Sequence, residues 1–461
     1  MDNSTQYKAF REAFSEFIYE DYTISESEGS LDIAFNFSIP GLARFRPAWS
    51  FSLLEPLGPS IDRQCLDGLV FSLGMVELIS YWKICCPPRV RIMAGTLDNA
   101  QAAWWKKLYV GGLGEYFYKN GISPGDDFME IISHAPTRRA AVGSFRTAAA
   151  PLPKVLVPIG GGKDSAVTLE LLRVAADRYG YVINPRGATD NTAVAAGIGA
   201  DKMVIARRTL DENMLLLNKQ GFLNGHTPFS AIVAFSSVLA GYINGLDFIA
   251  LSNESSANEM TVAGSDVNHQ YSKSFGFELD FRRYEREYLC TGVEYFSLLR
   301  PLSELQIARL FAGYKQYHPI FRSCNAASKL DEWCGVCPKC LFVYIILSPF
   351  LEERELAAIF YKNLFADLSL KDTLDELVGF TPEKPFECVG SRDEVRASLE
   401  LTAAKYNKRA EPLPPLLSYY CENRRAAPVD TEKILTCLNA ENAVPPYFLS
   451  IVMSAAKVGY N

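Results

Sequence analysis

A run of glycines followed by charged and hydroxyl side chains is the part of this chain best suited to chemistry. It consists of Gly160, Gly161, Gly162, Lys163, Asp164 and Ser165. The apolar residues from Val155 to Ile159 predict a strand before it, and the pattern from Ala166 to Leu172 predicts a helix after it. Glycines let the backbone approach a ligand closely, and the first N–H groups of a helix point into the same space. The segment therefore has the properties of a phosphate-binding turn.

This turn belongs to a longer alternation of strands and helices. Strands are predicted at 154–159, 181–184, 202–205 and 248–251, with helical patterns between them. Such a pattern indicates an α/β fold with a doubly wound parallel sheet, in which ligands lie beyond the carboxyl ends of the strands. The polar residues expected at those ends are Arg186, Arg207, Arg208, Ser252, Asn253 and Glu254.

Two kinds of phosphate loop are compatible with a glycine-rich turn. A Walker A loop is excluded because Val157 stands at its first glycine position and Asp164 follows Lys163. The turn instead resembles the Ser-Gly-Gly-x-Asp-Ser loop of the N-type ATP pyrophosphatases (PP-loop), with Gly160 in place of the first Ser. The resemblance implies that the glycine amides and Ser165 hold pyrophosphate, that Asp164 reaches Mg²⁺ and that Lys163 supplies positive charge. The alternative is a turn that only packs a helix on a strand.

The length of the chain, 461 residues, exceeds what one hydrophobic core usually supports. With 48% hydrophobic and 21% charged residues, the composition is that of a globular protein. We predict an N-terminal α+β domain at 1–147, a PP-loop ATP-binding domain with a cysteine cluster at 152–350, and a helical C-terminal region at 351–461. An Ala-rich segment flanked by Pro, 147–153, is the predicted linker. We assign the last sixty residues a packing role, because they carry no chemical motif.

Charge and hydropathy limit the classes of partner. The net charge is −7, whereas proteins that grip nucleic acid usually carry a basic excess. The N-terminus has neither the basic start nor the apolar core of a signal peptide. The longest apolar stretches, 231–243 and 341–351, are too short or too rich in Ser and Gly to cross a bilayer. We therefore expect a cytoplasmic protein that binds neither nucleic acid nor a membrane, with its oligomeric state left open.

Two polar loops interrupt the later part of the strand–helix pattern. His226 lies in the first, just ahead of Pro228 and an apolar helical pattern. The second extends from Ser252 to Lys273 and contains His269. A long polar loop inside a compact domain is typical of a lid or a substrate loop. Both histidines are therefore candidates for acid–base chemistry or binding, and a surface histidine without a role is the alternative for each.

Five cysteines lie in the C-terminal half in positions that suggest chemistry. Cys334, Cys337 and Cys340 are spaced by three residues, and Cys324 lies ten residues upstream, which fits the four thiolates of a structural zinc site. Free thiols, an iron–sulfur cluster and a redox pair are the alternatives. Cys388 stands alone, and it is either a reactive thiol or a small core side chain.

Taken in order, the motifs resemble the UDP-N-acetylmuramoyl-L-alanyl-L-glutamate epimerase family. The resemblance extends from about residue 30 to about residue 400, and the last sixty residues depart from it. The motifs that carry it are Gly-Gly-Gly-Lys-Asp-Ser at 160–165, Asn-Gly-His at 224–226, Ser-Asn-Glu at 252–254, Asn-His-Gln at 268–270, Ser-Lys at 272–273, Tyr-Phe-Ser-Leu-Leu-Arg-Pro-Leu-Ser-Glu at 295–304, Trp-Cys-Gly-Val-Cys-Pro-Lys-Cys at 333–340 and Lys-Pro-Phe-Glu-Cys-Val-Gly at 384–390.

The resemblance implies an ATP-dependent amino-acid epimerase of peptidoglycan synthesis. Its substrate would be UDP-N-acetylmuramoyl-L-alanyl-L-glutamate, whose terminal glutamate is inverted through an acyl-adenylate, with ATP and Mg²⁺ as cofactors and Zn²⁺ as a structural candidate. Position next to the strand ends makes His226, Glu254, His269, Lys273 and Cys388 the candidate acid–base residues. Arg186, Lys273 and Arg300 are candidates to hold carboxylates or phosphates.

Two other classes of function remain open. One is a PP-loop ATP pyrophosphatase that adenylates another acid, an amide or a nucleobase. The other is a catalytically silent nucleotide-binding scaffold, against which the intact Lys163-Asp164-Ser165 sequence argues.

Overall fold

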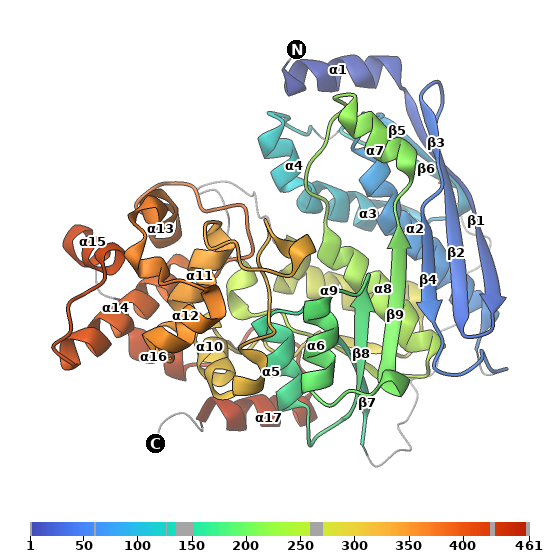
Figure 1. Cartoon of the computed structure of the whole chain (residues 1–461). Coiled ribbons are helices and arrows are strands. Elements are labelled where there is room, and N and C mark those ends of the chain that lie inside the picture. Colours follow the sequence, from blue (N-terminus) through green and yellow to red (C-terminus); the bar gives the residue numbers. More distant parts are fainter. Residues whose placement is uncertain are drawn as a thin grey trace.

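One large sheet runs through the protein. The computed structural model describes residues 2–59, 61–125, 127–134, 152–258, 271–424 and 429–457. Within these residues the sheet has 11 strands, in the order β11-β10-β7-β8-β9-β4-β2-β1-β5-β6, with β3 paired to β2 (Figure 1). The strands of the N-terminal half are β1 (Glu16–Ser27), β2 (Ser30–Ile39), β3 (Ala43–Phe45), β4 (Ala48–Ser52), β5 (Arg89–Thr96) and β6 (Glu130–His134).

The second half of the sheet is parallel. Its strands are β7 (Lys154–Pro158), β8 (Asp177–Ile183), β9 (Met203–Thr209), β10 (Phe248–Leu251) and β11 (Glu294–Ser297). The chain adds β8 and β9 on one side of β7 and then β10 and β11 on the other, so the strand order reverses at β7. The prediction of a parallel sheet is confirmed. In open α/β sheets the ligand crevice lies at such a reversal, here beyond the ends of β7 and β10.

The two halves of the sheet are joined by β4 and β9. These strands pair antiparallel, with Ala48 opposite Thr209 and Ser50 opposite Arg207. Because of this pairing, β9 continues through Arg207 and Arg208, and the expectation that these arginines follow the strand is wrong. The predicted linker lies largely outside the described residues, and the predicted division at residues 147 and 152 stays a prediction.

A hydrophobic core lies on each face of the sheet. Leu156 of β7 points into the first core, whereas its neighbours Val155 and Val157 point into the second. The helices whose apolar residues fill the first core are α2 (Arg63–Trp82), α3 (Asn99–Gly112), α4 (Gly114–Lys119), α7 (Glu212–Lys219), α8 (Phe229–Ile243) and α9 (Phe275–Tyr284), and α1 (Asn3–Ala13) packs against it. The second core contains residues of α5 (Lys163–Leu171), α6 (Gly187–Ala195), α10 (Glu304–Gly313) and α11 (Pro338–Leu347).

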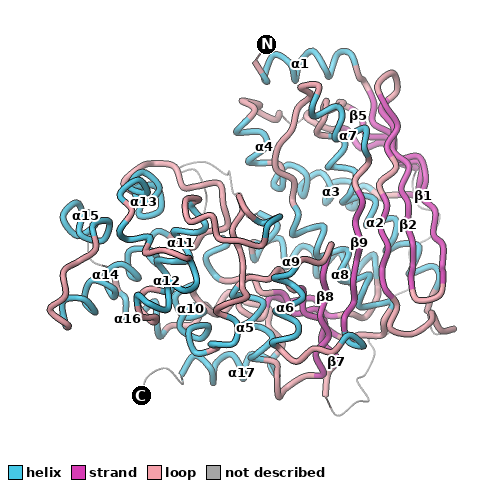
Figure 2. The backbone as a smooth tube through the Cα atoms, viewed as in Figure 1, coloured by secondary structure: helices cyan, strands magenta, loops and turns pink. Residues whose placement is uncertain are grey.

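The chain after β11 is helical. Figure 2 shows only helices and loops in this part, beside the strands. Its further helices are α12 (Glu353–Phe360), α13 (Lys371–Val378), α14 (Arg392–Lys408), α15 (Pro415–Asn423), α16 (Thr431–Thr436) and α17 (Pro446–Lys457). Phe448 of α17 packs against Phe248 and Phe296, with ring centroids 5.2 Å apart in each pair. This contact agrees with a packing role for the last sixty residues.

The helix α2 is apolar enough and long enough, at 20 residues, to meet the length and composition of a membrane span. However, 83% of its apolar window is buried inside the protein, where it packs between strands and α8. Its apolar character is therefore explained by its place in the first core.

The helix α3 ends on a glycine pair, Gly111 and Gly112, and Leu113 separates it from α4. A Cβ at Gly111 would lie 2.7 Å from the ring of Tyr271, and one at Gly112 would lie 2.6 Å from Pro228. The two glycines therefore let both polar loops of the parallel half approach the N-terminal helices closely.

Candidate active site

The glycine turn joins β7 to α5 at the carboxyl edge of the sheet. Gly161 has a φ of +81°, and a Cβ there would lie 2.9 Å from Ala188, so glycine is required on both grounds. The Gly160 carbonyl accepts a hydrogen bond from Arg186 (3.2 Å), and the Gly161 carbonyl accepts one from the N–H of Arg322 (2.8 Å). The turn is thus held at the N-terminus of α5, where the helix dipole and free N–H groups favour an anion.

Lys163 forms the first of two linked charge clusters. Its side chain is 2% exposed and contacts the carboxylates of Asp164 and Glu304. Burial lowers the pKa of Lys163, but these two carboxylates outweigh burial and raise the pKa above its usual range. Glu304 opens α10, and its own N–H donates to Glu394 Oε1 (2.7 Å).

The pKa values of the two carboxylates in this cluster, Asp164 and Glu304, are shifted in opposite directions. Burial tends to raise the pKa of Asp164, but Lys163 and Lys339 hold that pKa below its usual range. For Glu304, burial dominates and the charge of Asp164 adds to it, so the pKa is raised despite Lys163. Asp164 is therefore the permanent anion of the cluster.

Lys273 and Cys388 form the second cluster, with 3.3 Å between Nζ and Sγ. The Lys273 ammonium also interacts electrostatically with Glu254 and Asp164, which links the two clusters. Burial lowers the pKa of Lys273, but Cys388 and Glu254 outweigh it and raise the pKa. An ammonium next to a thiol stabilises the thiolate form of that thiol.

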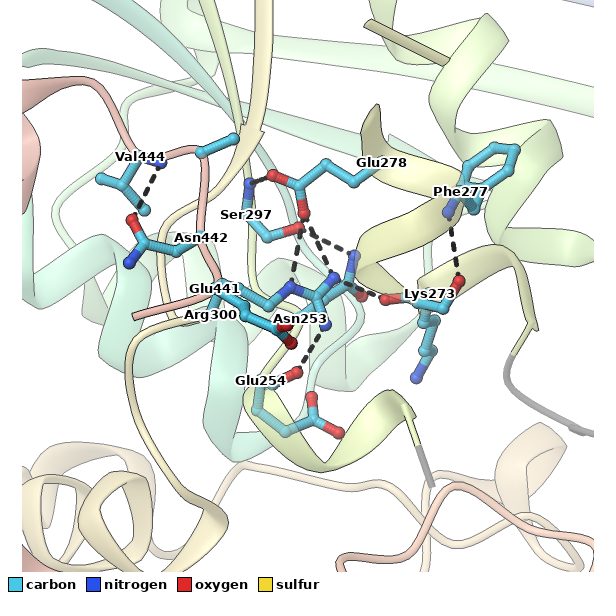
Figure 3. Close-up of polar contacts among 12 residues, drawn as sticks. Asn253, Glu254, Lys273, Phe277, Glu278, Ser297, Arg300, Glu441, Asn442 and Val444 are labelled. Atoms are coloured by element: carbon cyan, nitrogen blue, oxygen red, sulfur yellow. Dashed lines mark hydrogen bonds and ion pairs between the residues drawn. The ribbon is translucent and has the colours of Figure 1, made fainter. Parts of the chain in front are cut away.

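Arg300 positions the residues around Lys273 (Figure 3). Its guanidinium is fully buried and donates to the carbonyls of Glu254 (2.6 Å) and Lys273 (2.5 Å) and to Glu278 Oε2 (3.2 Å). In Figure 3 the side chains of Glu254 and Lys273 point away from Arg300, to the same side. Arg300 therefore fixes the backbones that present Glu254 and Lys273.

The residues that follow β10 lie beside the glycine turn, as expected from the strand order. The hydroxyls of Ser252 and Thr168 of α5 are 2.8 Å apart. The side-chain amide of Asn253 donates to Ser297 Oγ (3.1 Å) at the end of β11. Ser252 and Asn253 thus tie three elements together at the carboxyl edge.

The Cys388 loop is anchored by two lysines. Lys339 Nζ donates to the Cys388 carbonyl, and the Lys339 N–H donates to Glu387 Oε2 (2.7 Å). Lys384 Nζ donates to the Gly390 carbonyl (2.9 Å). These contacts hold the Cys388 loop against the N-terminal end of α11.

His226 lies beside α4, a helix of the N-terminal half that forms one wall of the site. Its Nδ1 lies 3.6 Å from Glu115 Oε2 of α4. The same helix contacts the Cys388 loop, because the rings of Tyr118 and Phe386 are 5.2 Å apart. The fold therefore brings the His226 loop and the Cys388 loop against one short helix. His269 lies outside the described residues.

The four clustered cysteines are arranged as metal ligands. Their sulfurs all lie within 4.8 Å of one another, and the individual contacts measure 3.8 Å (Cys324 to Cys337), 3.7 Å (Cys334 to Cys340) and 3.5 Å (Cys337 to Cys340). Four sulfurs at about 2.3 Å from a tetrahedral zinc ion lie roughly 3.8 Å apart. The N–H groups of Ala327 and Val336 point at two of the sulfurs. The group can therefore bind a metal ion such as zinc.

Sequence reasoning missed two residues of the first cluster. Glu304 was part of a recognised motif without a role, and Lys339 was part of the cysteine motif. An acidic residue in the first turn of a helix is ordinarily explained by the helix dipole, so Glu304 carried no distinctive signal. Conversely, Arg208 is a structural residue, since its guanidinium forms a bidentate pair with buried Glu77 in the first core.

The strand order and the charged cluster at its reversal point define an α/β protein with a candidate site at the carboxyl edge of its sheet. Comparison with known families narrows this class. A family model described as the MurL N-terminal domain matches residues 8–298, and one described as the MurL C-terminal domain matches residues 320–427. The chain therefore belongs to the MurL family, as the motifs predicted.

Three curated relatives are each called UDP-N-acetyl-alpha-D-muramoyl-L-alanyl-L-glutamate epimerase. The Xanthomonas oryzae protein is 36% identical over 72% of this chain and 74% of its own length. The Salinispora tropica protein is 36% identical over 77% of this chain and 78% of its own length. The Micromonospora protein is 33% identical over 94% of this chain and 96% of its own length. No solved structure matches the chain.

Proposed function

We propose that the protein inverts the terminal L-glutamate of UDP-N-acetylmuramoyl-L-alanyl-L-glutamate to D-glutamate for peptidoglycan synthesis, with ATP converted to AMP and diphosphate. The names of the three relatives support the substrate and the inversion. The observation that carries the ATP-dependent route is the meeting of the glycine turn and the Lys273–Cys388 pair at one edge of the sheet. One element suits a polyphosphate, and the other suits proton transfer.

The chemistry explains why both elements are needed. Removing the α-proton of a glutamate whose carboxylate is ionised adds charge to an existing anion. Transfer of AMP to that carboxylate removes its negative charge and makes the carbonyl an electron sink. Proton removal from one face, return from the other and hydrolysis to AMP then complete the inversion.

The glycine turn provides the ATP end of the site in this proposal, as part of a doubly wound PP-loop fold. The N–H groups of the turn and of α5 bind the departing pyrophosphate, together with Ser165. Lys163 neutralises charge that develops on the phosphates. The depressed pKa of Asp164 keeps this carboxylate ionised, as a ligand for Mg²⁺ must be. Arg186, which holds the Gly160 carbonyl, keeps the turn in place.

The Lys273–Cys388 pair provides the base that removes or returns the α-proton. Cys388 is half-buried, and the nearby ammonium favours its thiolate. His226, paired with Glu115 on the wall formed by α4, is the candidate for the opposite face of the α-carbon. Glu254 acts through its charge on Lys273.

The cysteine cluster holds a structural zinc ion in this proposal. Cys340 and Lys339 lie in the first turn of α11, and Lys339 anchors the Cys388 loop. A metal at the cluster would therefore support the geometry of the base as well as the fold.

The test is a reaction in deuterated water with purified protein, Mg²⁺, ATP and the muramoyl dipeptide substrate. We expect substrate-dependent pyrophosphate and AMP together with D-glutamate deuterated at the α-carbon. AMP without inversion would contradict epimerisation and favour adenylation of another acid. No pyrophosphate with the substrate would contradict the whole proposal.

The same reaction with Cys388→Ser separates the two halves of the site. We expect deuterium incorporation to fall by roughly 100- to 10,000-fold, because general acid–base catalysis contributes that much. Pyrophosphate release should persist, since the glycine turn is intact. The matched control is Cys437→Ser, which replaces an exposed cysteine. Unchanged deuterium incorporation in Cys388→Ser would exclude Cys388 as the base.

A further inference from the structure

Within the described residues, part of one face of the sheet beside the glycine turn is not covered by a helix. Figure 1 shows β9, β4, β2 and β1 with no helix in front of them, whereas α5 and α6 lie in front of the neighbouring strands. This face carries a hollow of about 360 Å³. Its lining includes the polar residues Thr23, Ser25, Asp32, Arg46, Ser50, Arg207 and Thr209. A concave polar surface on a rigid sheet is suited to a hydrophilic ligand.

Two arginines give the hollow its charge. Arg46 and Arg207 are both exposed, and across the described part of the chain neither guanidinium has a hydrogen-bond or ion-pair partner. The backbone of Arg46 is fixed, because its N–H donates to Asp211 Oδ2 (2.7 Å). Asp32, the one acid among the lining residues, accepts a hydrogen bond from Ser30 Oγ (2.9 Å). The two guanidiniums therefore remain available for an anion.

The strand register puts Arg207 level with the glycine turn. Pro158 of β7 is opposite Tyr181 of β8, and Tyr181 is opposite Val204 of β9. Arg207 is three residues beyond Val204, just as Gly161 is three residues beyond Pro158. Two strand spacings, about 10 Å, separate β7 from β9.

We propose that Arg46 and Arg207 bind the diphosphate of the UDP-linked substrate while its glutamate end lies at the glycine turn. This inference rests on the proposed function. An extended dipeptide spans up to about 7 Å, and the lactyl group and the sugar ring extend the reach beyond that. The substrate is therefore long enough to connect the two positions. Guanidinium groups suit this task because their forked donors match phosphate oxygens. Asp32 and Ser25 would face the ribose hydroxyls.

The test measures equilibrium binding of UDP and of uridine to the full chain without ATP. We expect the wild-type protein to prefer UDP to uridine at least tenfold, since hydrogen bonds to charged groups contribute about that much. Arg46→Ala and Arg207→Ala should each weaken UDP binding by roughly tenfold or more and leave uridine binding unchanged. The matched control is Arg44→Ala, which removes an arginine of the adjacent β3 that is 85% exposed and outside the hollow.

The outcomes separate this subsite from the proposed reaction. UDP binding that is unchanged in both arginine variants overturns the subsite, even if the protein is an epimerase. Loss of UDP binding in both variants, with the control unchanged, supports the subsite whether or not AMP is formed. A steady-state assay adds a second readout, in which the variants should raise KM for the UDP-linked substrate more than they lower kcat.

Discussion

Two buried ion pairs lie on opposite faces of the same sheet and differ in their surroundings. In the first core, Arg208 donates hydrogen bonds of 3.1, 3.0 and 2.8 Å to Glu77, and the indole of Trp49 donates to the same carboxylate at 3.3 Å. In the second, Lys163 contacts both Asp164 and Glu304, with Lys339 close enough to influence both carboxylates. Arg208 and Glu77 form an isolated pair, whereas Lys163 belongs to a cluster with further charged side chains.

Burial and pairing alone therefore do not identify a functional site. The charge of Arg208 is balanced by Glu77, and the guanidinium is hydrogen-bonded to both carboxylate oxygens, which is typical of a structural pair. The charges around Asp164 are not matched in this way, because Lys163 contacts two carboxylates, and Lys339 and Lys273 also lie close enough to Asp164 to lower its pKa. Several lysines gathered beside a glycine turn are suited to a polyphosphate ligand.

Lys163→Met should disrupt the cluster around Lys163 and have the largest effect on activity. We expect the rate of pyrophosphate release to fall by about 1,000-fold, because the variant loses a preorganised cation at the phosphates. The measurement is pyrophosphate release with saturating substrate. Lys315→Met is the control, since Lys315 is 77% exposed and its ammonium makes a long contact of 3.8 Å with Glu355. A Lys163→Met rate within tenfold of wild type would contradict the role of this lysine.

Glu77→Gln should disrupt the pair of Arg208 and Glu77 and lower stability while activity is kept. Removing the carboxylate leaves Arg208 buried without a counter-charge, so the free energy of unfolding should fall by about 3–5 kcal/mol. Urea unfolding measures this change. The folded fraction should release pyrophosphate at a rate within about twofold of wild type. A loss of activity without a loss of stability would show that the two pairs are not different in kind.

Glu304→Gln should change the pH dependence of stability, because Glu304 is the residue of the Lys163 cluster whose pKa is raised. Burial raises the pKa of Glu304 above its ordinary value of 4.5, so the folded state holds a proton that the unfolded state releases. The free energy of unfolding should therefore fall as pH rises from about 4.5 towards about 8, the pKa of Glu304 in the folded state, by at most about 1.4 kcal/mol per pH unit from this group. The variant should show a flatter pH dependence in urea unfolding. An equally steep fall in the variant would assign the pH dependence to another group.

Lys202→Met should have the smallest effect, because it removes an ion pair that is partly exposed to solvent. Lys202 and Asp177 are 2.5 Å apart, with side chains 39% and 32% exposed. Such pairs contribute less than about 1 kcal/mol. Urea unfolding of this variant, beside Glu77→Gln, measures how much of the effect depends on burial. A loss as large as that of Glu77→Gln would remove burial as the explanation.

Much of the local structure follows from neighbouring residues and was predictable. The strand before the glycine turn and the helix after it depend on residues a few positions apart, and both are present. The cysteine cluster is another case, because three of its four members lie within seven residues of sequence. For these features, the spacing along the chain already contains the geometry.

The reactive segments and the family to which they belong follow from the order of residues along the chain. Which charged side chains meet depends on the tertiary structure. Lys163 and Glu304 are 141 residues apart, and Lys273 and Cys388 are 115 apart. The pairing of β4 with β9 likewise made Arg208 structural and left Arg207 in an open hollow. Adjacent residues on a strand face opposite sides of the sheet, so the fold gives two neighbouring arginines different surroundings.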